Sequence, residues 1–330
     1  MERDVYVDFL RALGLILLIG VHVHAPEWYV SLRSFDVPLM VFVSAMCYKP
    51  LRGGGVTYIV KRFKRIYVPV FVFLVIYFTI ALLSHNLNIM DSDNIKVILG
   101  SFMLLNEPSI GFVWVMRVFL IEAIILPIMH KITSYTKYSW AYSIIVLILV
   151  QSLLVNVLLL YNNKTGWLLG NQLLLYAIGY GPIVILGLVI KKLSFQQISN
   201  CVLLALTSLL IFMCCNKLEF CPQIYKYPPQ LIFTLYGIIV CSLLWMCRPS
   251  RGWSTLAVKT IPVISYLSKN SMWIYLWHIL ALHLLWSINR IIPMPFLGRY
   301  CVVIVCALIM TTIYLKVISF LPNRLYDILK

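Results

Sequence analysis

Residues 7–26 read VDFLRALGLILLIGVHVHAP, an apolar run that also carries a carboxylate, a guanidinium and imidazoles. About 20 apolar residues suffice for a helix to cross a bilayer, so the run predicts a membrane-spanning helix over residues 5–24. Arg11 and His22 both lie in it. A helix turns about 100° and rises about 1.5 Å per residue, which puts these two side chains on one face, roughly 16 Å apart along it.

Ionisable side chains at membrane depth are costly and usually line a protein interior or a wet cavity, so this pair is a functional-site hypothesis. Asp8 can pair with Arg11 at a three-residue spacing, which reduces the cost of burying both charges. His22 is the candidate general base, because imidazole titrates near neutral pH. The alternative is a structural histidine bonded across helices, and the charged neighbours favour the catalytic interpretation. His24 points away from His22 and is expected at the membrane interface.

The composition predicts an all-α, polytopic integral membrane protein. Of 330 residues, 62% are hydrophobic and 12% are charged, with a mean hydropathy of +0.93, whereas a soluble domain carries about 25% charged residues. The hydrophobic runs predict about ten helices in one bundle, and no insert interrupts them, so residues 1–330 are expected to form a single transmembrane domain. The predicted spans are 5–24, 35–48, 66–84, 112–129, 141–160, 167–190, 200–214, 229–247, 270–286 and 300–321. Residues 97–105 are expected to be re-entrant or interfacial.

The net charge of +16 first suggests a nucleic-acid partner, but the basic residues follow the topology of the chain and form no patch with interleaved aromatic side chains. Lys and Arg are more frequent in the loops that lie on the same side as the N-terminus. This bias predicts that both termini are cytoplasmic. We therefore expect a multi-pass protein of the cell membrane, surrounded by the lipid bilayer. We expect no nucleic-acid partner.

Two further groups of charged residues could take part in chemistry. Residues 61–65 (KRFKR) precede the third span, where they could be a topogenic and lipid-facing cluster or an anchor for a phosphate-rich cofactor. Trp114, Arg117 and Glu122 lie in the fourth span, where the charges could form a structural ion pair or line a substrate cavity. The nine cysteines show no metal-ligand spacing, so no metal is expected.

Six short stretches stand out along the chain. They are Asp8-Phe9-Leu10-Arg11 followed by His22; Phe35-Asp36-Val37-Pro38-Leu39 running to Ser44; Arg62-x-x-Arg65 leading into Ile66-Tyr67-Val68-Pro69; Gly111-Phe112-Val113-Trp114-Val115-Met116-Arg117; Lys226-Tyr227-Pro228-Pro229; and Asn270-Ser271-Met272-Trp273-Ile274-Tyr275-Leu276-Trp277-His278. Together they resemble the acyltransferase-3 family of membrane O-acyltransferases. Each motif is short, but their order and their extent over nearly the whole chain are specific.

The resemblance implies transfer of an acyl group, usually acetyl, from cytoplasmic acetyl-CoA to a hydroxyl of a surface glycan or its lipid-linked precursor. It implies a ten-helix core in the bacterial inner or plasma membrane. Arg11 and His22 match the catalytic residues of the family, with His22 as base or transient acyl carrier and Arg11 orienting the donor or stabilising negative charge. Arg62 and Arg65 match the motif that we assign to acyl-CoA binding. The residues assigned to the substrate cavity are Asp8, Asp36, Ser44, Trp114, Arg117 and Glu122.

The chain departs from the family at Ser44-Ala45, where many members have Ser-Gly. The methyl group of alanine keeps a neighbouring helix backbone further away than glycine would. The substitution therefore affects the expected packing of this helix more than the expected chemistry. His278 matches a Tyr-Leu-x-His pattern of the family, and structural hydrogen bonding is favoured for it over catalysis.

A transporter or glycan flippase is the alternative from a different class, because buried Arg, Glu and His could also bind substrate or relay protons. Against it, no corresponding pair of Gly- or Pro-broken spans occurs in two halves of the chain, and the ionisable residues gather in the first and fourth spans. A transporter predicts glycan flux without consumption of acyl-CoA, and an acyltransferase predicts an ester on the glycan.

Overall fold

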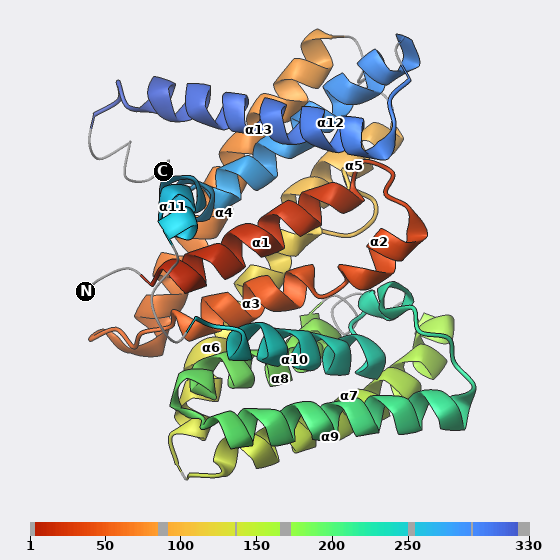
Figure 1. Cartoon of the computed structure of the whole chain (residues 1–330). Helices are drawn as coiled ribbons and strands as arrows, with labels where there is room; N and C mark the ends of the chain where they lie inside the picture. Colours follow the sequence, from red (N-terminus) through yellow and green to blue (C-terminus); the bar gives the residue numbers. More distant parts are fainter. Residues whose placement is uncertain are drawn as a thin grey trace. The chain divides into compact units, whose positions relative to one another are not determined.

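The computed structural model describes residues 4–84, 92–135, 137–165, 173–249, 255–291 and 293–322, and all regular structure in these ranges is helical (Figure 1). The helices are α1 (Val5–Val21), α2 (Glu27–Leu32), α3 (Asp36–Met46), α4 (Gly54–Leu83), α5 (Ser92–Phe102), α6 (Trp114–Thr133), α7 (Ser139–Thr165), α8 (Leu175–Val189), α9 (Phe195–Asn216), α10 (Leu231–Met246), α11 (Thr255–Lys269), α12 (Ser271–Ile291) and α13 (Phe296–Ile318), with the short 3₁₀ helices η2 (Ile190–Lys192) and η3 (Pro222–Lys226).

Each predicted span coincides with a helix, although residues 166–172, at the start of the span predicted over 167–190, lie outside the described residues. Within the described part of the chain, five helical segments are long and apolar enough to cross a membrane: Glu27–Met46, Gly54–Leu83, Leu175–Lys192, Phe195–Asn216 and Phe296–Ile318. Shorter apolar helices cover Ser139–Val155, Leu231–Met246 and Ser271–Trp286. The protein is therefore a helical membrane protein, and the number of ten spans stays a prediction.

Two helices differ from the boundaries that hydropathy predicts. α4 begins at Gly54 and has 30 residues, where a span over 66–84 was expected; at about 1.5 Å per residue it is longer than a hydrocarbon core of about 30 Å. Its basic residues 61–65 therefore lie on the helix itself, in turns that precede the apolar part. Of the region expected to be re-entrant or interfacial over 97–105, residues 97–102 belong to α5, with Gly100 and Ser101 buried and Leu99 exposed.

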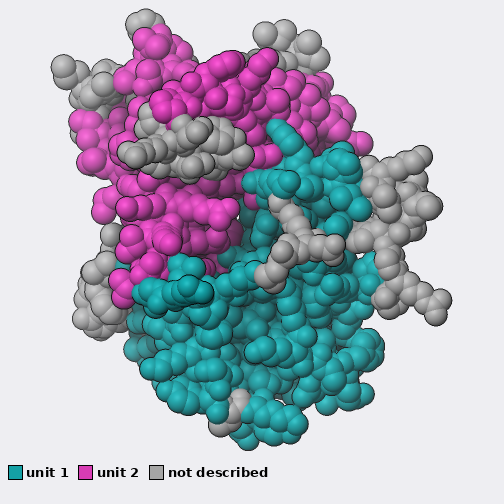
Figure 2. Space-filling model, turned by 90° about the vertical axis from the view of Figure 1, so that its left-hand side faces the viewer, with its two compact units in different colours: residues 1–18, 26–55, 124–269 teal, residues 19–25, 56–123, 270–330 magenta. Residues whose placement is uncertain are grey.

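The chain folds into two compact units (Figure 2). Unit 1 comprises residues 1–18, 26–55 and 124–269, and unit 2 comprises residues 19–25, 56–123 and 270–330. Because the segments of the two units alternate along the sequence, α1, α4 and α6 each contribute residues to both.

In unit 1, helix α8 packs against α3, α7 and α10 (Figure 1). A Cβ atom added at Gly187 of α8 would lie 2.6 Å from the carbonyl oxygen of Phe42 and 2.7 Å from Cβ of Ala45, both on α3. Close approach of two membrane helices requires such small residues. Glycine in α8 therefore provides the space beside α3, which explains why the Ser44-Ala45 departure is compatible with tight packing.

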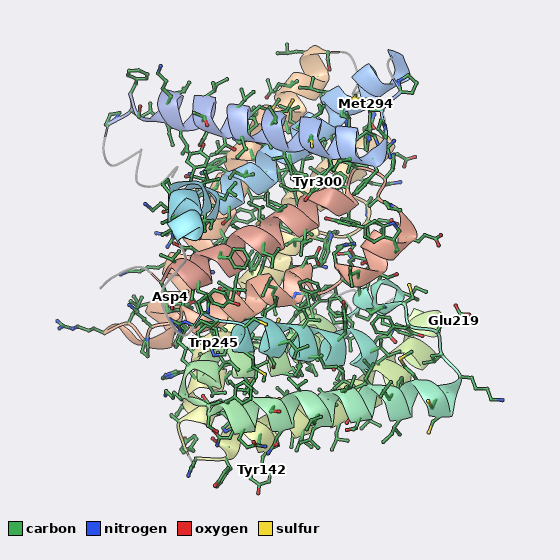
Figure 3. All side chains as sticks on the ribbon, viewed as in Figure 1. Asp4, Tyr142, Glu219, Trp245, Met294 and Tyr300 are labelled. Carbon is green, nitrogen blue, oxygen red and sulfur yellow. The ribbon has the colours of Figure 1, made fainter. Side chains whose placement is uncertain are left out.

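The ends of α1 and α10 in unit 1 are joined by Arg248, whose Nη2 lies 3.1 Å from Asp4 Oδ2. Its guanidinium also lies over the ring of Trp245, 4.9 Å from the centroid. Figure 3 labels Asp4, which directly precedes α1, and Trp245, which lies on α10. A cation between a carboxylate and an indole face is stabilised by both, so Arg248 links the start of α1 to the end of α10.

In unit 2, helix α12 packs against α13. The ring centroids of Trp273 and Tyr314, one on each helix, are 4.1 Å apart. Ser101 of α5 accepts a hydrogen bond from the backbone N–H of Ile110 at 2.9 Å and so braces the loop that precedes α6. Gly111 lies in this loop with a φ of 82°, a conformation that favours glycine because it has no Cβ. The next residue, Phe112, reaches the histidines described below.

The exposed sides of several helices are apolar. On α13 the residues Val305, Ile309, Ile313 and Val317 recur every four positions and are all more than half exposed. Residues four apart lie on one face of a helix, so this is a continuous apolar stripe. A stripe of this kind suits contact with lipid, as the composition predicted.

Candidate functional site

The first helix runs from Val5 to Val21, three residues short of the end predicted at residue 24. His22 was expected within the helix and instead follows its last residue. The backbone N–H of His22 donates to the carbonyl oxygen of Ile19 at 3.1 Å, which ends the helix with a tight turn. Arg11 belongs to unit 1 and His22 to unit 2.

His22 contacts a second histidine in unit 2. Its Nδ1 lies 2.8 Å from Nε2 of His278 on α12, and the two rings lie edge to edge and nearly in one plane, with an interplanar angle of 19° and centroids 5.0 Å apart. His22 is half-buried, whereas His278 is fully buried. A hydrogen bond between two imidazoles requires one donor and one acceptor, so the protonation of each ring depends on the other.

Aromatic residues hold this pair of rings. Phe112 meets His22 edge-on, with ring centroids 4.7 Å apart. The Tyr275 hydroxyl donates to the carbonyl oxygen of Phe112 at 2.6 Å, and the Tyr275 carbonyl oxygen accepts from Nδ1 of His278. Helix α12 therefore fixes both His278 and the loop residue that packs on His22. This arrangement restricts the rotation of the His22 ring.

The candidate residues of α6 follow Phe112 closely along the chain. Trp114, Arg117 and Glu122 are all buried. Nη2 of Arg117 donates to Oδ1 of Asn106, in the loop before α6, at 2.7 Å. Trp114 and Arg117 are thus placed next to the loop that carries Phe112, and their role as cavity residues stays a prediction.

The Arg62 and Arg65 pair lies on α4, where Arg62 is half-buried and Arg65 exposed. Residues three apart on a helix are neighbours on its surface. The two guanidinium groups can therefore approach one ligand from one face, and their assignment to acyl-CoA binding stays a prediction.

In unit 1, Arg11 forms a small polar cluster with Asp8, as the three-residue spacing predicted. Nη1 of Arg11 lies 3.7 Å from Asp8 Oδ1, and both groups bond to Ser268 of α11: Arg11 Nη1 donates to Ser268 Oγ at 3.1 Å, and Ser268 Oγ donates to Asp8 Oδ1 at 2.7 Å. Nη2 of Arg11 also lies 3.6 Å from Sγ of Cys47. The Asp8 side chain is 7% exposed and that of Arg11 27%, so the guanidinium is held in place but still reachable.

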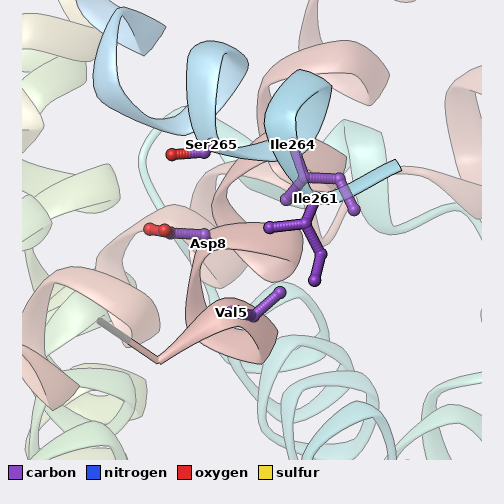
Figure 4. A pocket seen from close by; sticks show the side chains of 5 residues that line it. All are labelled: Val5, Asp8, Ile261, Ile264 and Ser265. Atoms are coloured by element: carbon purple, nitrogen blue, oxygen red, sulfur yellow. The ribbon is translucent and has the colours of Figure 1, made fainter. Parts of the chain in front are cut away.

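A pocket of about 100 Å³ lies beside this cluster (Figure 4). Asp8 and Val5 line it from α1, and Ile261, Ile264 and Ser265 line it from α11. The lining is mainly apolar, with the Asp8 carboxylate as its charged group.

Asp36, at the start of α3, lies in a different polar cluster of unit 1. Its carboxylate pairs with Arg33, lies 3.4 Å from Nζ of Lys226 and accepts from the backbone N–H of Val37 at 2.7 Å. Arg33 also donates to Gln223 Oε1 at 3.1 Å. Burial lowers the pKa of Lys226 to about 8, although the negative charge of Asp36 acts to raise it. These contacts are those of a buried ion cluster, and the assignment of Asp36 to the substrate cavity is still a prediction.

The remaining candidate, Ser44, is half-buried on α3. Sequence reasoning missed Ser268, Arg33 and Gln223 and favoured a structural role for His278. A signal for Arg33 was present, because it precedes Asp36 by three residues. Nothing local indicates Ser268, which reaches Asp8 from a point 260 residues further along the chain.

In the described ranges, no three or more His, Cys, Asp or Glu side chains gather in a way that could hold a metal ion.

Residues 4–315 match the family model of the acyltransferase-3 type, described as an acyltransferase domain. No curated protein and no solved structure matches the chain.

Proposed function

The chain belongs to the acyltransferase-3 family, and on that premise we propose that this membrane acyltransferase moves an acetyl group from cytoplasmic acetyl-CoA to a hydroxyl of a cell-surface glycan or its lipid-linked precursor. The match over residues 4–315 supports acyl transfer in the membrane. The donor, the acceptor and the roles of individual residues are the parts that we propose.

The proposed chemistry centres on His22. As general base, its imidazole takes the proton of the acceptor hydroxyl while the oxygen attacks the thioester carbonyl. The tetrahedral intermediate collapses, the C–S bond breaks, CoA leaves as the thiolate and the ester remains on the glycan. In the alternative, the imidazole carries the acetyl group between donor and acceptor. The half-buried position of His22 and its contacts to His278 and Phe112 support either role.

The proposed donor site uses arginines. CoA carries several phosphates, and guanidinium groups bind phosphate with two parallel hydrogen bonds. Arg62 and Arg65 would bind these phosphates from the basic turns of α4. Arg11, held by Asp8 and Ser268, would orient the donor or stabilise negative charge on the thioester oxygen.

The substrate cavity is proposed to include Asp8, Asp36, Ser44, Trp114, Arg117 and Glu122. Burial of the three α6 residues supports this assignment, because buried ionisable groups in a membrane protein usually serve a site. We further propose a bacterial inner or plasma membrane location with both termini in the cytoplasm, where acetyl-CoA is available to Arg62 and Arg65.

The observation that carries the proposal is the His22–His278 pair, a half-buried imidazole oriented by a buried one in a protein of this family. The test is mass spectrometry of surface glycans from a deletion strain that is complemented with wild type, His22→Asn or His24→Asn. His24 is the matched control, because it is exposed two residues further on and stacks on Trp286, and because Asn tolerates its positive φ.

We expect an acetyl-sized ester with wild type and His24→Asn, and none with His22→Asn at equal abundance in the membrane. An ester that persists in the deletion strain, or that His22→Asn restores fully, contradicts the proposal.

A further inference from the structure

We propose that His278 is a positioning residue that fixes the tautomer of His22, so that Nδ1 of His22 carries the proton and Nε2 is the basic atom. The proposal rests on the proposed function of His22 as the base. It follows from the donors and acceptors that surround the two rings.

The first step concerns Nδ1 of His278. This atom faces the carbonyl oxygen of Tyr275, one turn earlier on α12. A carbonyl oxygen can only accept a hydrogen bond, so Nδ1 of His278 must carry the hydrogen. The helix backbone therefore selects one tautomer of His278.

The second step concerns the charge of His278. Its ring is fully buried, and its polar contacts among the described residues are the Tyr275 carbonyl and His22, neither of them a carboxylate. A buried cation without a counter-ion is strongly disfavoured, so His278 is neutral. With its hydrogen on Nδ1, a neutral ring has its lone pair on Nε2.

The third step concerns the tautomer of His22. Nε2 of His278 lies 2.8 Å from Nδ1 of His22 and can only accept there. Nδ1 of His22 must then donate, and the lone pair of the neutral His22 ring is on Nε2. The opposite tautomer of His22 would set two lone pairs against each other at hydrogen-bond distance.

The same contacts stabilise His22 after it takes the proton. When Nε2 of His22 takes the proton of the acceptor hydroxyl, the imidazolium keeps its Nδ1–H bonded to His278, and that bond strengthens because the donor is charged. His278 gains no proton, because its fully buried ring would then carry a charge without a carboxylate beside it. The edge contact with Phe112 holds the His22 ring while this happens. The buried histidine thus acts through His22 and has no direct contact with substrate.

The test compares three side chains at position 278 in membrane vesicles of the complemented deletion strain, which contain the native acceptor and are supplied with radiolabelled acetyl-CoA. His278→Gln keeps an acceptor near the place of Nε2. His278→Phe keeps a ring without an acceptor, and His278→Asn is an amide too short to reach. His283→Phe is the matched control, because His283 is a half-buried histidine of the same helix that bonds the Tyr77 hydroxyl at 2.6 Å.

We expect His278→Phe to lower kcat by about 100-fold or more, in the range that general acid–base groups contribute, with KM for acetyl-CoA unchanged. His278→Gln should retain most of the activity, and His283→Phe should match wild type. If His278→Phe fails to accumulate in the membrane, the contrast between His278→Gln and His278→Asn supplies the same comparison.

Two results overturn the inference in different ways. If wild type transfers label and His22→Asn does not, while His278→Phe or His278→Asn transfers at the wild-type rate, His278 does not position His22 and the proposed function stands. If wild type transfers no label from acetyl-CoA, the proposed function fails and this inference fails with it.

Discussion

Asp36→Asn removes the carboxylate that two buried cations share, and we expect it to destabilise the fold strongly. The side chains of Asp36, Arg33 and Lys226 are 0%, 2% and 1% exposed. Asn keeps the size of the side chain but not its charge. Arg33 would then keep its positive charge in a space that water does not reach, and Lys226 would either stay charged there or lose its proton; both outcomes cost free energy.

The magnitude follows from the distances. Nζ of Lys226 lies 3.4 Å from Oδ1 of Asp36, and unit charges at this separation attract by about 5 kcal/mol at an effective dielectric constant of about 20. The pair with Arg33 is closer. Part of this attraction is offset, because the neutral side chain is no longer desolvated as an ion. Removal of one partner from a buried pair costs about 3–5 kcal/mol, and we expect a loss of that size in the free energy of unfolding.

The assay is a titration of the purified protein in mixed detergent and SDS micelles, followed by tryptophan fluorescence. Asp93→Asn is the control, since Asp93 pairs with Lys96 at 2.8 Å but is 80% exposed; exposed ion pairs contribute little. The double variant Asp36→Asn, Lys226→Met should recover part of the loss because it removes one stranded cation. If Asp36→Asn unfolds at the same SDS fraction as Asp93→Asn, the reasoning is refuted.

Gly187→Ala should lower the free energy of unfolding by about 1–3 kcal/mol, the usual cost of overpacking, because its Cβ would meet Ala45 at 2.7 Å; an unchanged SDS midpoint would contradict this. Tyr275→Phe should slow acetyl transfer about fivefold at equal membrane abundance, since it removes a hydrogen bond to Phe112 that is worth about 1 kcal/mol, and a wild-type rate in vesicles would argue against that role. Because burial lowers the pKa of Lys226 from 10.5 to about 8, the folded state binds fewer protons than the unfolded state between these values, and stability should rise with pH there. Lys226→Met should lack this rise when the SDS titration is repeated from pH 8 to 10.5.

Much of the fold could be predicted from the sequence because membrane helices are defined locally. A run of apolar residues is favoured in lipid wherever it occurs, and its backbone groups are satisfied within the same helix. Each predicted span therefore met a helix in the structure. The start of α4 was misplaced, because a helix can continue beyond its apolar part into basic turns, and hydropathy does not register those turns.

The candidate site was predicted in part. The Asp8–Arg11 pair follows from helix spacing, which is a local property, and the structure confirms it. His278 is different, because it contacts His22 across 256 residues of sequence. Its Tyr-Leu-x-His pattern marked the position without indicating what the ring contacts.

The sequence by itself determined that this is a helical membrane protein, placed Asp8 and Arg11 on the first helix and identified the acyltransferase-3 family, because hydropathy, helical spacing and motif order are all properties of the linear chain. Only the tertiary structure decided that His22 meets His278, that Lys226 joins Asp36 across 190 residues and that Gly187 makes room for Ala45. These contacts depend on how helices pack, and packing is set by the shapes of side chains that are distant in sequence.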